Sequence, residues 1–375
     1  MIEEWARKHP EFRTTDTVGR EAFFALAEQH ALAPLRSFLP QATSTLSVLH
    51  AAFELGVPFS HLGGGTYQLG WGAKARRIGN TSTDHDSALG AHLVHRKDLT
   101  VRLLRSAGLP ALVHELVNNL ESAHAAAKRI GWPVVVKPTD AERVEGVKVD
   151  VQAEDLDAAF TRVYEHSRAH LVLIKRLVPR ICYRLFVVGG QLLYAVRRLP
   201  IGVYADGKLT VPQLVEKAYA GERLLPPGKR SPLQPLDELA LTALGRQGLQ
   251  IDAVPPVGQF VALRPIETTA WGGVYEDVTS TIHPENLRAA LAASTLCGLE
   301  VAGVDMISCD ITVPWHANGA VINEVNLSPF LGEGVLTDRH VKTFLTRLVG
   351  DGGRIPVEVY VGNAAAVAVA RQAVI

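Results

Sequence analysis

The chain has 375 residues, enough for two or three packed units, and its 47% hydrophobic and 20% charged content is ordinary for a globular protein. Its 38 Lys and Arg residues balance its 38 Asp and Glu residues, so no net field favours nucleic acid or an anionic membrane as a partner. Three cysteines without a CxxC pair exclude a disulfide framework and a zinc knuckle and favour a reducing cytoplasm. The N-terminus lacks an apolar signal segment and the apolar tail is too short to cross a bilayer, so we expect a cytoplasmic protein.

The first part of the chain predicts helices and then a glycine-rich hairpin. Residues 1–60 have a loosely helical pattern. The segment HLGGGTYQLGWGAKARRIG (61–79) indicates a loop and hairpin that presents the cationic side chains of Lys74, Arg76 and Arg77. KDLTVRLLRSAGLP (97–110) then predicts an amphipathic helix that its glycine and proline stop.

The middle of the chain alternates helices with strands. A predicted helix over 121–130 leads to the apolar run 134–136, which indicates a buried strand that ends at a lysine. A second helix is predicted over about 154–168. YRLFVVGGQLLYAVRRL (183–199) predicts a β-hairpin that turns at its Gly-Gly pair.

The last part of the chain begins with a loosely patterned stretch. Residues 205–280 are rich in proline and predict a long, partly fixed loop with a short helix from Leu236. A helix is predicted over 284–298. Two strands are then expected over 300–308 and 319–326, joined through an Asn-Gly turn region.

Three oxygen-bearing side chains lie in these last two strands. Glu324 and Asn326 are two residues apart, so both point to one face of a strand, and Asp305 lies in the preceding strand. Carboxylate and amide oxygens suit magnesium, which completes its shell with water and phosphate oxygens. The same pattern fits solvent-facing polar positions of a hairpin, and the pair alone does not decide between the two.

Two lysines add to this pattern. Lys137 ends the buried strand with an ammonium group, which needs a partner there, and phosphate suits a point charge. Lys97, at the start of a predicted helix, carries less weight because most such lysines are simply solvated.

The order of these motifs resembles the ATP-grasp ligases, and within them the ATP-grasp module of cyanophycin synthetases. The similarity runs from about residue 45 to about residue 358, and it rests on order and spacing rather than on one short pattern. Its motifs include QLGWGAKARRI, TSTDHDSALG, KDLTVRLL, GWPVVVKP, YRLFVV, LDELALTALGRQG, WGGVYEDVT, IHPE, AGVDMI and INEVN. The resemblance implies an α/β (α+β) protein of the ATP-grasp fold, with an N-terminal α/β piece, a lid subdomain and a C-terminal sheet subdomain.

The same resemblance implies a division of the chain. A region that precedes the ATP-grasp core covers 1–95, and the lid subdomain covers 96–200. The C-terminal subdomain with the metal site covers 201–360, and a tail covers 361–375.

Particular residues receive roles from the resemblance. Lys97 and Lys137 match the lysines that hold the nucleotide phosphates. Asp305, Glu324 and Asn326 match the magnesium ligands.

Other matched positions concern the cleft and the substrate. Arg184 and Arg197 match strand arginines that face the cleft, which implies catalytic contacts with phosphate or carboxylate; an exposed strand arginine is an equal alternative. The matched substrate-facing residues are Lys74, Arg76, Arg77, Trp271, Gly272 and Gly273.

The sequence departs from the family pattern at the nucleotide. The glycine-rich lid loop is replaced by TDAERVEGV (139–147), where Gly146 alone remains and Arg143 offers a side-chain contact to phosphate instead. The acidic residue expected near adenine and ribose is Lys175, which becomes a candidate nucleotide contact, and a second acidic position is Cys182.

These features predict an ATP- and Mg2+-dependent ligase that joins a carboxylate to an amine of an amino acid or small peptide through an acyl phosphate. No GxxxxGK[ST] motif follows GRIP (353–356), so we expect a stand-alone ATP-grasp core. One alternative is a degenerate ATP-grasp protein that binds an amino-acid-like ligand or partner without turnover, which the altered loop favours. A carboxylase that uses bicarbonate is disfavoured because biotin-linked modules are missing. The expected partner is a small molecule, not nucleic acid or membrane, and homo-oligomerisation stays open.

Overall fold

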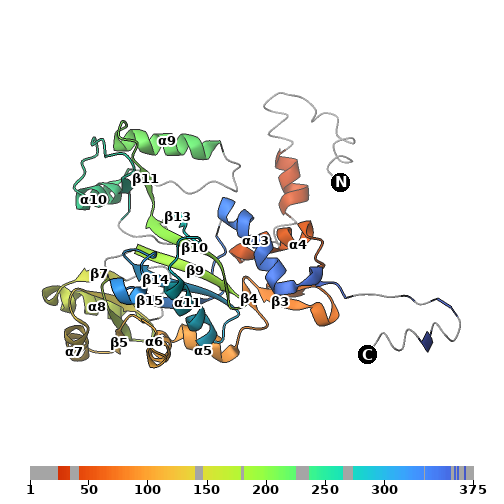
Figure 1. Ribbon diagram of the computed structural model, residues 1–375. Helices are drawn as coiled ribbons and strands as arrows, with labels where there is room; N and C mark the ends of the chain where they lie inside the picture. The colour runs from red at the N-terminus through yellow and green to blue at the C-terminus, as the bar shows by residue number, and fades with distance from the viewer. Residues whose placement is uncertain are drawn as a thin grey trace.

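A five-stranded antiparallel sheet lies at the centre of the molecule, with strand order β13-β10-β9-β14-β15 (Figure 1). Its strands are β9 (Ile181–Val188), β10 (Gln191–Pro200), β13 (Gly273–Asp277), β14 (Val301–Ser308) and β15 (Val321–Leu327). The predicted hairpin of β9 and β10 is confirmed, and its Gly189 and Gly190 have the positive φ values, 57° and 73°, that a tight two-residue turn requires. The computed structural model describes residues 24–33, 42–139, 147–178, 181–224, 236–264, 273–332, 334–355, 359, 361–362 and 367–368.

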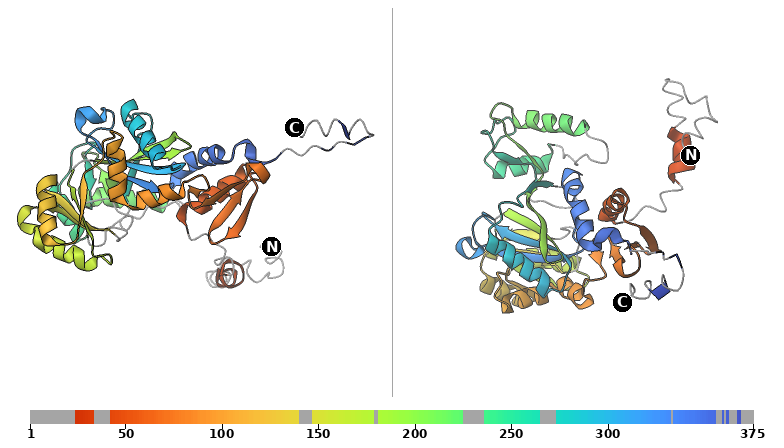
Figure 2. Two further views of the ribbon diagram at one scale, coloured as in Figure 1. Left: turned by 90° about the horizontal axis from the view of Figure 1, so that it is seen from below. Right: turned by 45° about the vertical axis from the view of Figure 1, so that its right-hand side comes forward.

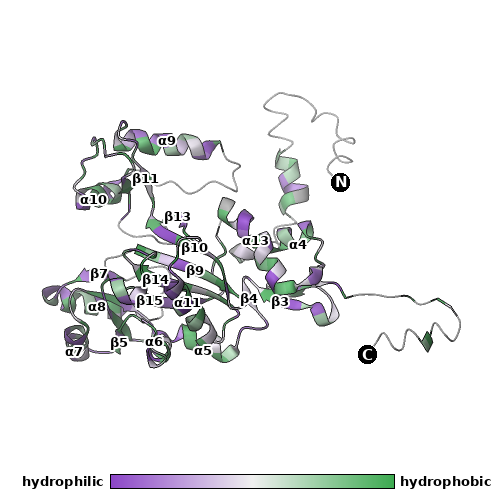
Figure 3. Ribbon diagram, in the orientation of Figure 1, coloured by the Kyte–Doolittle hydropathy of each residue, from purple (hydrophilic) through white to green (hydrophobic). Residues whose placement is uncertain are grey.

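The two faces of the central sheet are covered by different helices. On one face, Leu185 and Val304 pack against the alanines of α11 (Pro284–Leu296). On the other face, Phe186 and Val301 pack against α13 (Gly334–Val349). Arg184 and Asp305 lie on this second face as well, because each is an even number of residues away from Phe186 or Val301 on its strand and side chains alternate along a strand. The second face therefore has a charged end beside its apolar core, and Figure 3 shows that the edge strand β13 is largely hydrophilic.

A four-stranded sheet at the lower left of Figure 1 has the strand order β5-β8-β6-β7. Its strands are β5 (His114–Val117), β6 (Val134–Pro138), β7 (Lys148–Val151) and β8 (Val172–Arg176). One face packs against α7 (Leu120–Ile130) and α8 (Leu156–His166), which confirms the helices and the buried strand predicted there. The other face carries His114, Lys137 and Lys175, because His114 is directly opposite Lys175 and Lys175 is directly opposite Val135.

Residues 201–224 and 236–264 form a small unit with a core of its own, above the central sheet in Figure 1. It contains β11 (Gly202–Tyr204), α9 (Val211–Arg223), α10 (Glu238–Arg246) and β12 (Phe260–Ala262). Thr210 and Gln213 form a capping box at the start of α9, and the Asp237 side chain caps α10. The short helix expected from Leu236 is confirmed as α10, and α9 gives the region more regular structure than the long loop expected from its prolines.

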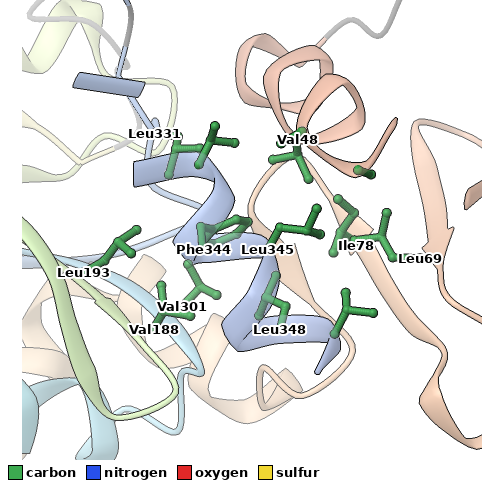
Figure 4. Close-up of a cluster of buried hydrophobic side chains, with 14 of the residues drawn as sticks. Val48, Leu69, Ile78, Val188, Leu193, Val301, Leu331, Phe344, Leu345 and Leu348 are labelled. Atoms are coloured by element: carbon green, nitrogen blue, oxygen red, sulfur yellow. The ribbon is translucent and has the colours of Figure 1, made fainter. Parts of the chain in front are cut away.

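The N-terminal unit lies at the opposite end from the four-stranded sheet (Figure 2). It contains α4 (Thr43–Glu54) and the sheet of β1 (Phe59–Gly63), β2 (Thr66–Leu69), β3 (Arg76–Gly79) and β4 (Ser82–Thr83). Figure 4 shows the side chains of α13 between this unit and the central sheet. The buried side chains that meet there are Val48, Leu69, Ile78, Val188, Leu193, Val301, Leu331, Phe344, Leu345 and Leu348.

Further α-helices connect these parts. They are α5 (Ala88–His95), α6 (Lys97–Ser106) and α12 (Trp315–Asn318). The connection from β14 to β15, predicted as an Asn-Gly turn region, is the single turn of α12 followed by Gly319 at φ 69°. Within the described ranges, no helix is long and apolar enough to cross a membrane.

One boundary of the expected division differs from the strand pairing. A lid over 96–200 includes β9 and β10, but β9 pairs with β14 from Val188 opposite Val301 to Ile181 opposite Ser308. The four-stranded sheet therefore ends with β8, and the central sheet takes strands from both expected subdomains. The alternation of apolar and polar residues along two strands predicts that they form a hairpin, but it does not predict which sheet the hairpin joins.

Candidate active site

A pocket lies where α6, β5 and β15 meet. Apolar atoms make up most of its lining, and its polar lining comes from Lys97, Thr100, His114, Asn323, Glu324 and Asn326. The facing surfaces belong to two different sheets, because β5 is in the four-stranded sheet and β15 is in the central sheet. The pocket therefore brings together residues from widely separated parts of the sequence.

Glu324 is the carboxylate on the β15 side of this pocket. Its Oε1 accepts hydrogen bonds from Nζ of Lys97 at 2.9 Å and Nζ of Lys137 at 3.0 Å. Burial alone would raise the pKa of Glu324, but Lys137, Lys97 and Lys175 hold it well below its usual range. Burial lowers the pKa of Lys137, and Glu324 only partly offsets that effect. The two lysines predicted to hold phosphate thus meet one predicted metal ligand.

Asp305 is held by arginines on the neighbouring strands. It lies opposite Arg184 in the sheet, and Arg184 donates to its two oxygens at 2.7 and 2.8 Å. Nη1 of Arg198 lies 3.4 Å from Oδ2, and Nδ2 of Asn326 lies at the same distance. The Asp305 side chain is only 6% exposed, so these partners replace the water that its charge would otherwise require.

A β-bulge in β15 aims two adjacent side chains toward the site. Glu324 pairs with Asp305, but Ile322 pairs with the next residue of β14, Met306, so Asn323 is the extra residue. Ile322 and Val325 are both buried in the core that includes the alanines of α11, while Asn323 and Glu324 accept hydrogen bonds from Lys175 and Lys137 of the four-stranded sheet. A regular strand would send Asn323 and Glu324 to opposite faces.

Lys175 and His114 face this bulge from the four-stranded sheet. Nζ of Lys175 donates to Oδ1 of Asn323 at 3.1 Å, and burial lowers the pKa of Lys175. Burial lowers the pKa of His114 to about 4, and the charges of Lys137 and Lys175 act in the same direction. His114 is therefore neutral near pH 7, and within the described part of the chain its buried Nε2 has no hydrogen-bond partner.

The charges at the site are unequal. Five cationic side chains face two carboxylates there, and they are Lys97, Lys137, Lys175, Arg184 and Arg198. In the described ranges no group of three His, Cys, Asp or Glu side chains could hold a metal alone. The donor set instead fits a divalent cation that arrives with a polyphosphate, because the phosphate oxygens supply the missing ligands and negative charge.

A match to a family described as the carbamoyl-phosphate synthase L chain, ATP binding domain, covers residues 97–182. The cyanophycin synthetase of Nostoc sp. is 30% identical over 325 residues, which is 84% of this chain and 36% of that protein. The glutathione biosynthesis bifunctional protein of Mannheimia succiniciproducens is 30% identical over 256 residues, covering 66% of this chain and 34% of that protein. The crystal structure of a bifunctional glutathione synthetase from Pasteurella multocida superposes with a TM-score of 0.59 at 25% identity, over 91% of this chain and 49% of that one.

The chain belongs to the ATP-grasp family. The predicted fold class is thereby confirmed, with the central sheet and the four-stranded sheet on either side of the pocket. This ATP-grasp protein spans about a third of the length of the curated relatives that it matches.

Arg197 corrects one expectation about the ATP-grasp site. It lies opposite Tyr183, on the face of β10 that turns away from Asp305, and its Nη1 lies 3.3 Å from Glu276. Arg198, one residue later, reaches Asp305 instead. Two consecutive arginines do not by themselves show which one lies on the Asp305 face of the strand, so Arg198 was not predicted from the sequence. Asn323 and His114 were not predicted either, because neither belongs to a recognisable motif.

The cations expected at the substrate lie far from the pocket. Arg76 pairs with Glu300 and Asp84, Arg77 with Asp84 at 3.4 Å, and Lys74 with Asp351 at 2.8 Å. Glu300 precedes β14, about 16 Å along the strand from Asp305. The structure therefore does not bring Lys74, Arg76 and Arg77 to the charged site.

Of the four remaining candidate residues, Gly273 begins β13, while Arg143, Trp271 and Gly272 lie outside the described residues. The TSTDHDSALG segment supports the loop after β15, because Thr81 donates to the Pro329 carbonyl at 2.7 Å and Asn80 donates to Ser328 at 3.0 Å. The start of this segment therefore contacts the loop that follows β15.

Proposed function

We propose that this ATP-grasp protein joins a carboxylate to an amine, on an amino acid or small peptide, with consumption of ATP to ADP and phosphate. The observation that carries the proposal is the set of five cationic side chains around Asp305 and Glu324, on facing surfaces of two sheets. Such an excess of positive charge suits a polyphosphate better than a neutral or cationic ligand. The relatives named above, cyanophycin synthetase and the glutathione biosynthesis protein, support the amino acid and peptide class.

The lysines have the positions needed to hold the phosphates. Nζ of Lys97 and Nζ of Lys137 already lie within 3.0 Å of Oε1 of Glu324. A phosphate that enters between the two lysines would therefore replace Glu324 as their anionic partner. Lys175 contacts Asn323 through one of its three N–H bonds, which leaves donors for the nucleotide. His114, whose Nε2 has no partner within the described residues, lines the same pocket.

Asp305, Glu324 and Asn326 would hold magnesium beside the phosphates. Magnesium would supply neutralisation of the phosphate oxygens during transfer. The chain's own part is to orient these ligands, which the strand pairing of β14 and β15 and the contacts of Arg184 and Asn326 with Asp305 accomplish.

Arg184 and Arg198 hold Asp305, and in this proposal they face the acyl group and the transferred phosphoryl group. A carboxylate is a poor electrophile until it is phosphorylated, and the acyl phosphate then reacts with an amine held next to it. The carbon–nitrogen bond forms as the carbon–oxygen bond to phosphate breaks, and the proton of the amine passes to the leaving phosphate. The guanidinium groups stabilise the anionic oxygens of both steps.

The test is ADP formation with ATP, Mg2+ and a pool of L-amino acids and dipeptides, with product masses read by mass spectrometry. We expect ADP release that requires the pool, and Glu324→Gln should lower the rate by about a hundred-fold or more. Glu216→Gln, on the exposed surface of α9, is the matched control and should keep the parent rate. Nucleotide binding without ADP release across the pool would instead identify a ligand-binding protein and contradict the proposal.

A further inference from the structure

The turn that follows β15 lies beside the charged residues of the candidate site. Pro329 is buried and packs on Gly303, because a Cβ added to Gly303 would lie only 2.8 Å from Cβ of Pro329 and 3.6 Å from Nε of Arg184. Gly303 is two residues before Asp305 on β14, so both are on the same face of the sheet. The ring of Pro329 therefore lies close to the guanidinium group that holds Asp305.

Ser328 gives this turn a backbone conformation that does not hold itself. Its φ is 50°, in the left-handed region that residues other than glycine, asparagine and aspartate rarely adopt. Such a conformation persists when surrounding contacts fix it. The residues that fix this turn therefore also determine where Pro329 lies.

These contacts come from the connection between β3 and β4 in the N-terminal unit. Oγ1 of Thr81, which is fully buried, donates to the Pro329 carbonyl at 2.7 Å. Oγ of Ser328 accepts from Nδ2 of Asn80 at 3.0 Å and from the backbone N–H of Thr81 at 3.3 Å. Asn80 is fixed in turn, because its Oδ1 accepts from the backbone N–H of Ser44 at 3.1 Å. The turn is thus held from outside the two sheets that face the pocket.

Asn326 is the predicted metal ligand nearest to this turn, two residues before Ser328. It lies directly opposite Gly303, and its Nδ2 donates to the Gly303 carbonyl at 3.3 Å and to Oδ2 of Asp305 at 3.4 Å. Movement of Pro329 away from Gly303 would shift Asn326 on β15 and open space beside Arg184. Both side chains depend on the position of one turn.

We propose that Thr81 is a positioning residue of this site: through the turn after β15, it keeps Arg184 and Asn326 in the arrangement that a metal ion and a nucleotide require. Asn80 acts with Thr81 on the same turn. The inference rests on the proposed function, since it assumes that metal and nucleotide bind here. It gives the N-terminal unit a part in the reaction although the cations of that unit lie far from the pocket.

The experiment measures the affinity of Mn2+ for the complex of the full chain with ADP, by electron paramagnetic resonance of the free ion. Thr81→Val keeps the shape of the side chain and removes its hydroxyl. We expect Mn2+ to bind about ten-fold to a hundred-fold more weakly, the range typical of residues that orient metal ligands. Thr81→Ser keeps a hydroxyl and should bind Mn2+ as the parent does.

Two further variants separate positioning from stability. Ser294→Ala is the matched control, because the buried Ser294 hydroxyl donates to the Leu299 carbonyl at 3.0 Å on α11, which covers the opposite face of the central sheet. Urea unfolding should show similar losses for Ser294→Ala and Thr81→Val, while Ser294→Ala keeps the parent affinity for Mn2+. Asn80→Gly removes the amide at a φ of 57° that glycine adopts readily, and it should also weaken Mn2+ binding.

The outcomes distinguish this inference from the proposed function. Parent-like Mn2+ affinity in the folded Thr81→Val and Asn80→Gly proteins would overturn the positioning role and leave the proposed function standing. Equal weakening in Ser294→Ala would also overturn it, because loss of stability would then explain the effect. Weaker Mn2+ binding in the two variants of a parent that releases no ADP would support the inference and contradict the proposed function. A folded parent that does not bind ADP would contradict both. If Thr81→Val does not fold, Asn80→Gly decides.

Discussion

Arg184 and Asp305 lie directly opposite each other on β9 and β14, and the guanidinium contacts both carboxylate oxygens at 2.7 and 2.8 Å. This pair is the link between the apolar core of the central sheet and its charged end. Two strands far apart in the sequence are thus joined by an ion pair as well as by their backbone hydrogen bonds.

Removing Arg184 should destabilise the fold as well as the reaction. In Arg184→Met, Asp305 stays buried with Arg198 as its remaining guanidinium partner, and the free energy of unfolding should fall by about 3 kcal/mol. Urea unfolding measures this loss. Arg197→Met breaks a more exposed pair with Glu276, so its loss should be at most about 1 kcal/mol. Equal losses in the free energy of unfolding of the two variants would show that the buried pair stabilises the fold no more than the exposed pair does.

Replacing Lys137 should weaken nucleotide binding with little effect on the fold. Lys137→Met keeps the stem and removes the charge, and a charged donor to phosphate is worth roughly 1.5–3 kcal/mol, so ADP should bind about ten-fold to a hundred-fold more weakly. Titration calorimetry with Mg2+ present gives the affinities, and Lys128→Met is the control on α7. An unchanged ADP affinity in Lys137→Met would contradict the role of Lys137.

The contact between Lys175 and Asn323 should appear as a coupling between the two positions. Asn323→Ala leaves a buried ammonium without its acceptor, which should cost about 1–3 kcal/mol in the free energy of unfolding. In a Lys175→Met background the same change should cost less than half as much, because no donor remains to be satisfied. Chemical unfolding of the four proteins completes the cycle, and strictly additive losses would exclude the interaction.

Arg76 should matter for stability rather than for substrate binding. Its side chain is 13% exposed and bonds to Glu300, to Asp84 and to the Leu348 carbonyl, so Arg76→Gln should lower the free energy of unfolding by about 1–3 kcal/mol. The KM for the amino-acid substrate should stay unchanged. Arg77→Gln, whose side chain is 58% exposed, is the control for stability. A raised KM with unchanged stability in Arg76→Gln would restore the substrate role that the sequence indicates.

His114 should make stability fall in weak acid. Its folded pKa is lowered from 6.5 to about 4, so between these values the unfolded chain binds a proton that the folded chain does not. Stability therefore decreases as the pH falls from 6.5 to 4, by about 1–2 kcal/mol once solvent screening is allowed for. His114→Gln should show a shallower decrease in unfolding experiments across this range. His95→Gln, at the exposed end of α5, should follow the parent curve; parallel curves for all three proteins would remove His114 as the cause.

Much of the site follows from local pattern. Lys137 lies at the end of an apolar strand, and Glu324 and Asn326 are two residues apart in another strand. The sequence therefore predicts that Glu324 and Asn326 share one face of their strand. The structure then places Lys97 and Lys137 on Glu324, a contact across 187 or more positions of the chain that no local pattern contains.

Other features were beyond such reasoning for physical reasons. The bulge at Asn323 changes the parity of β15 through its pairing with β14, and pairing register is a property of two strands together. The same holds for Arg197 and Arg198, whose neighbours on β9 and β13 decide which one reaches Asp305. Residues 205–280 appeared loop-like apart from the short helix from Leu236, because the prolines of the region mask α9, which its capping box begins.

The order of strands in the central sheet also governs when this protein can complete its fold during synthesis. Val188 of β9 pairs with Val301 of β14, so the middle of the sheet closes only after more than a hundred further residues have been made. The four-stranded sheet has its core between Val117 and Ile174 and depends on no later strand, so it can form first. Until β14 emerges, the hairpin of β9 and β10 carries an open edge, and the ribosome-bound chain must keep that edge from pairing with another molecule.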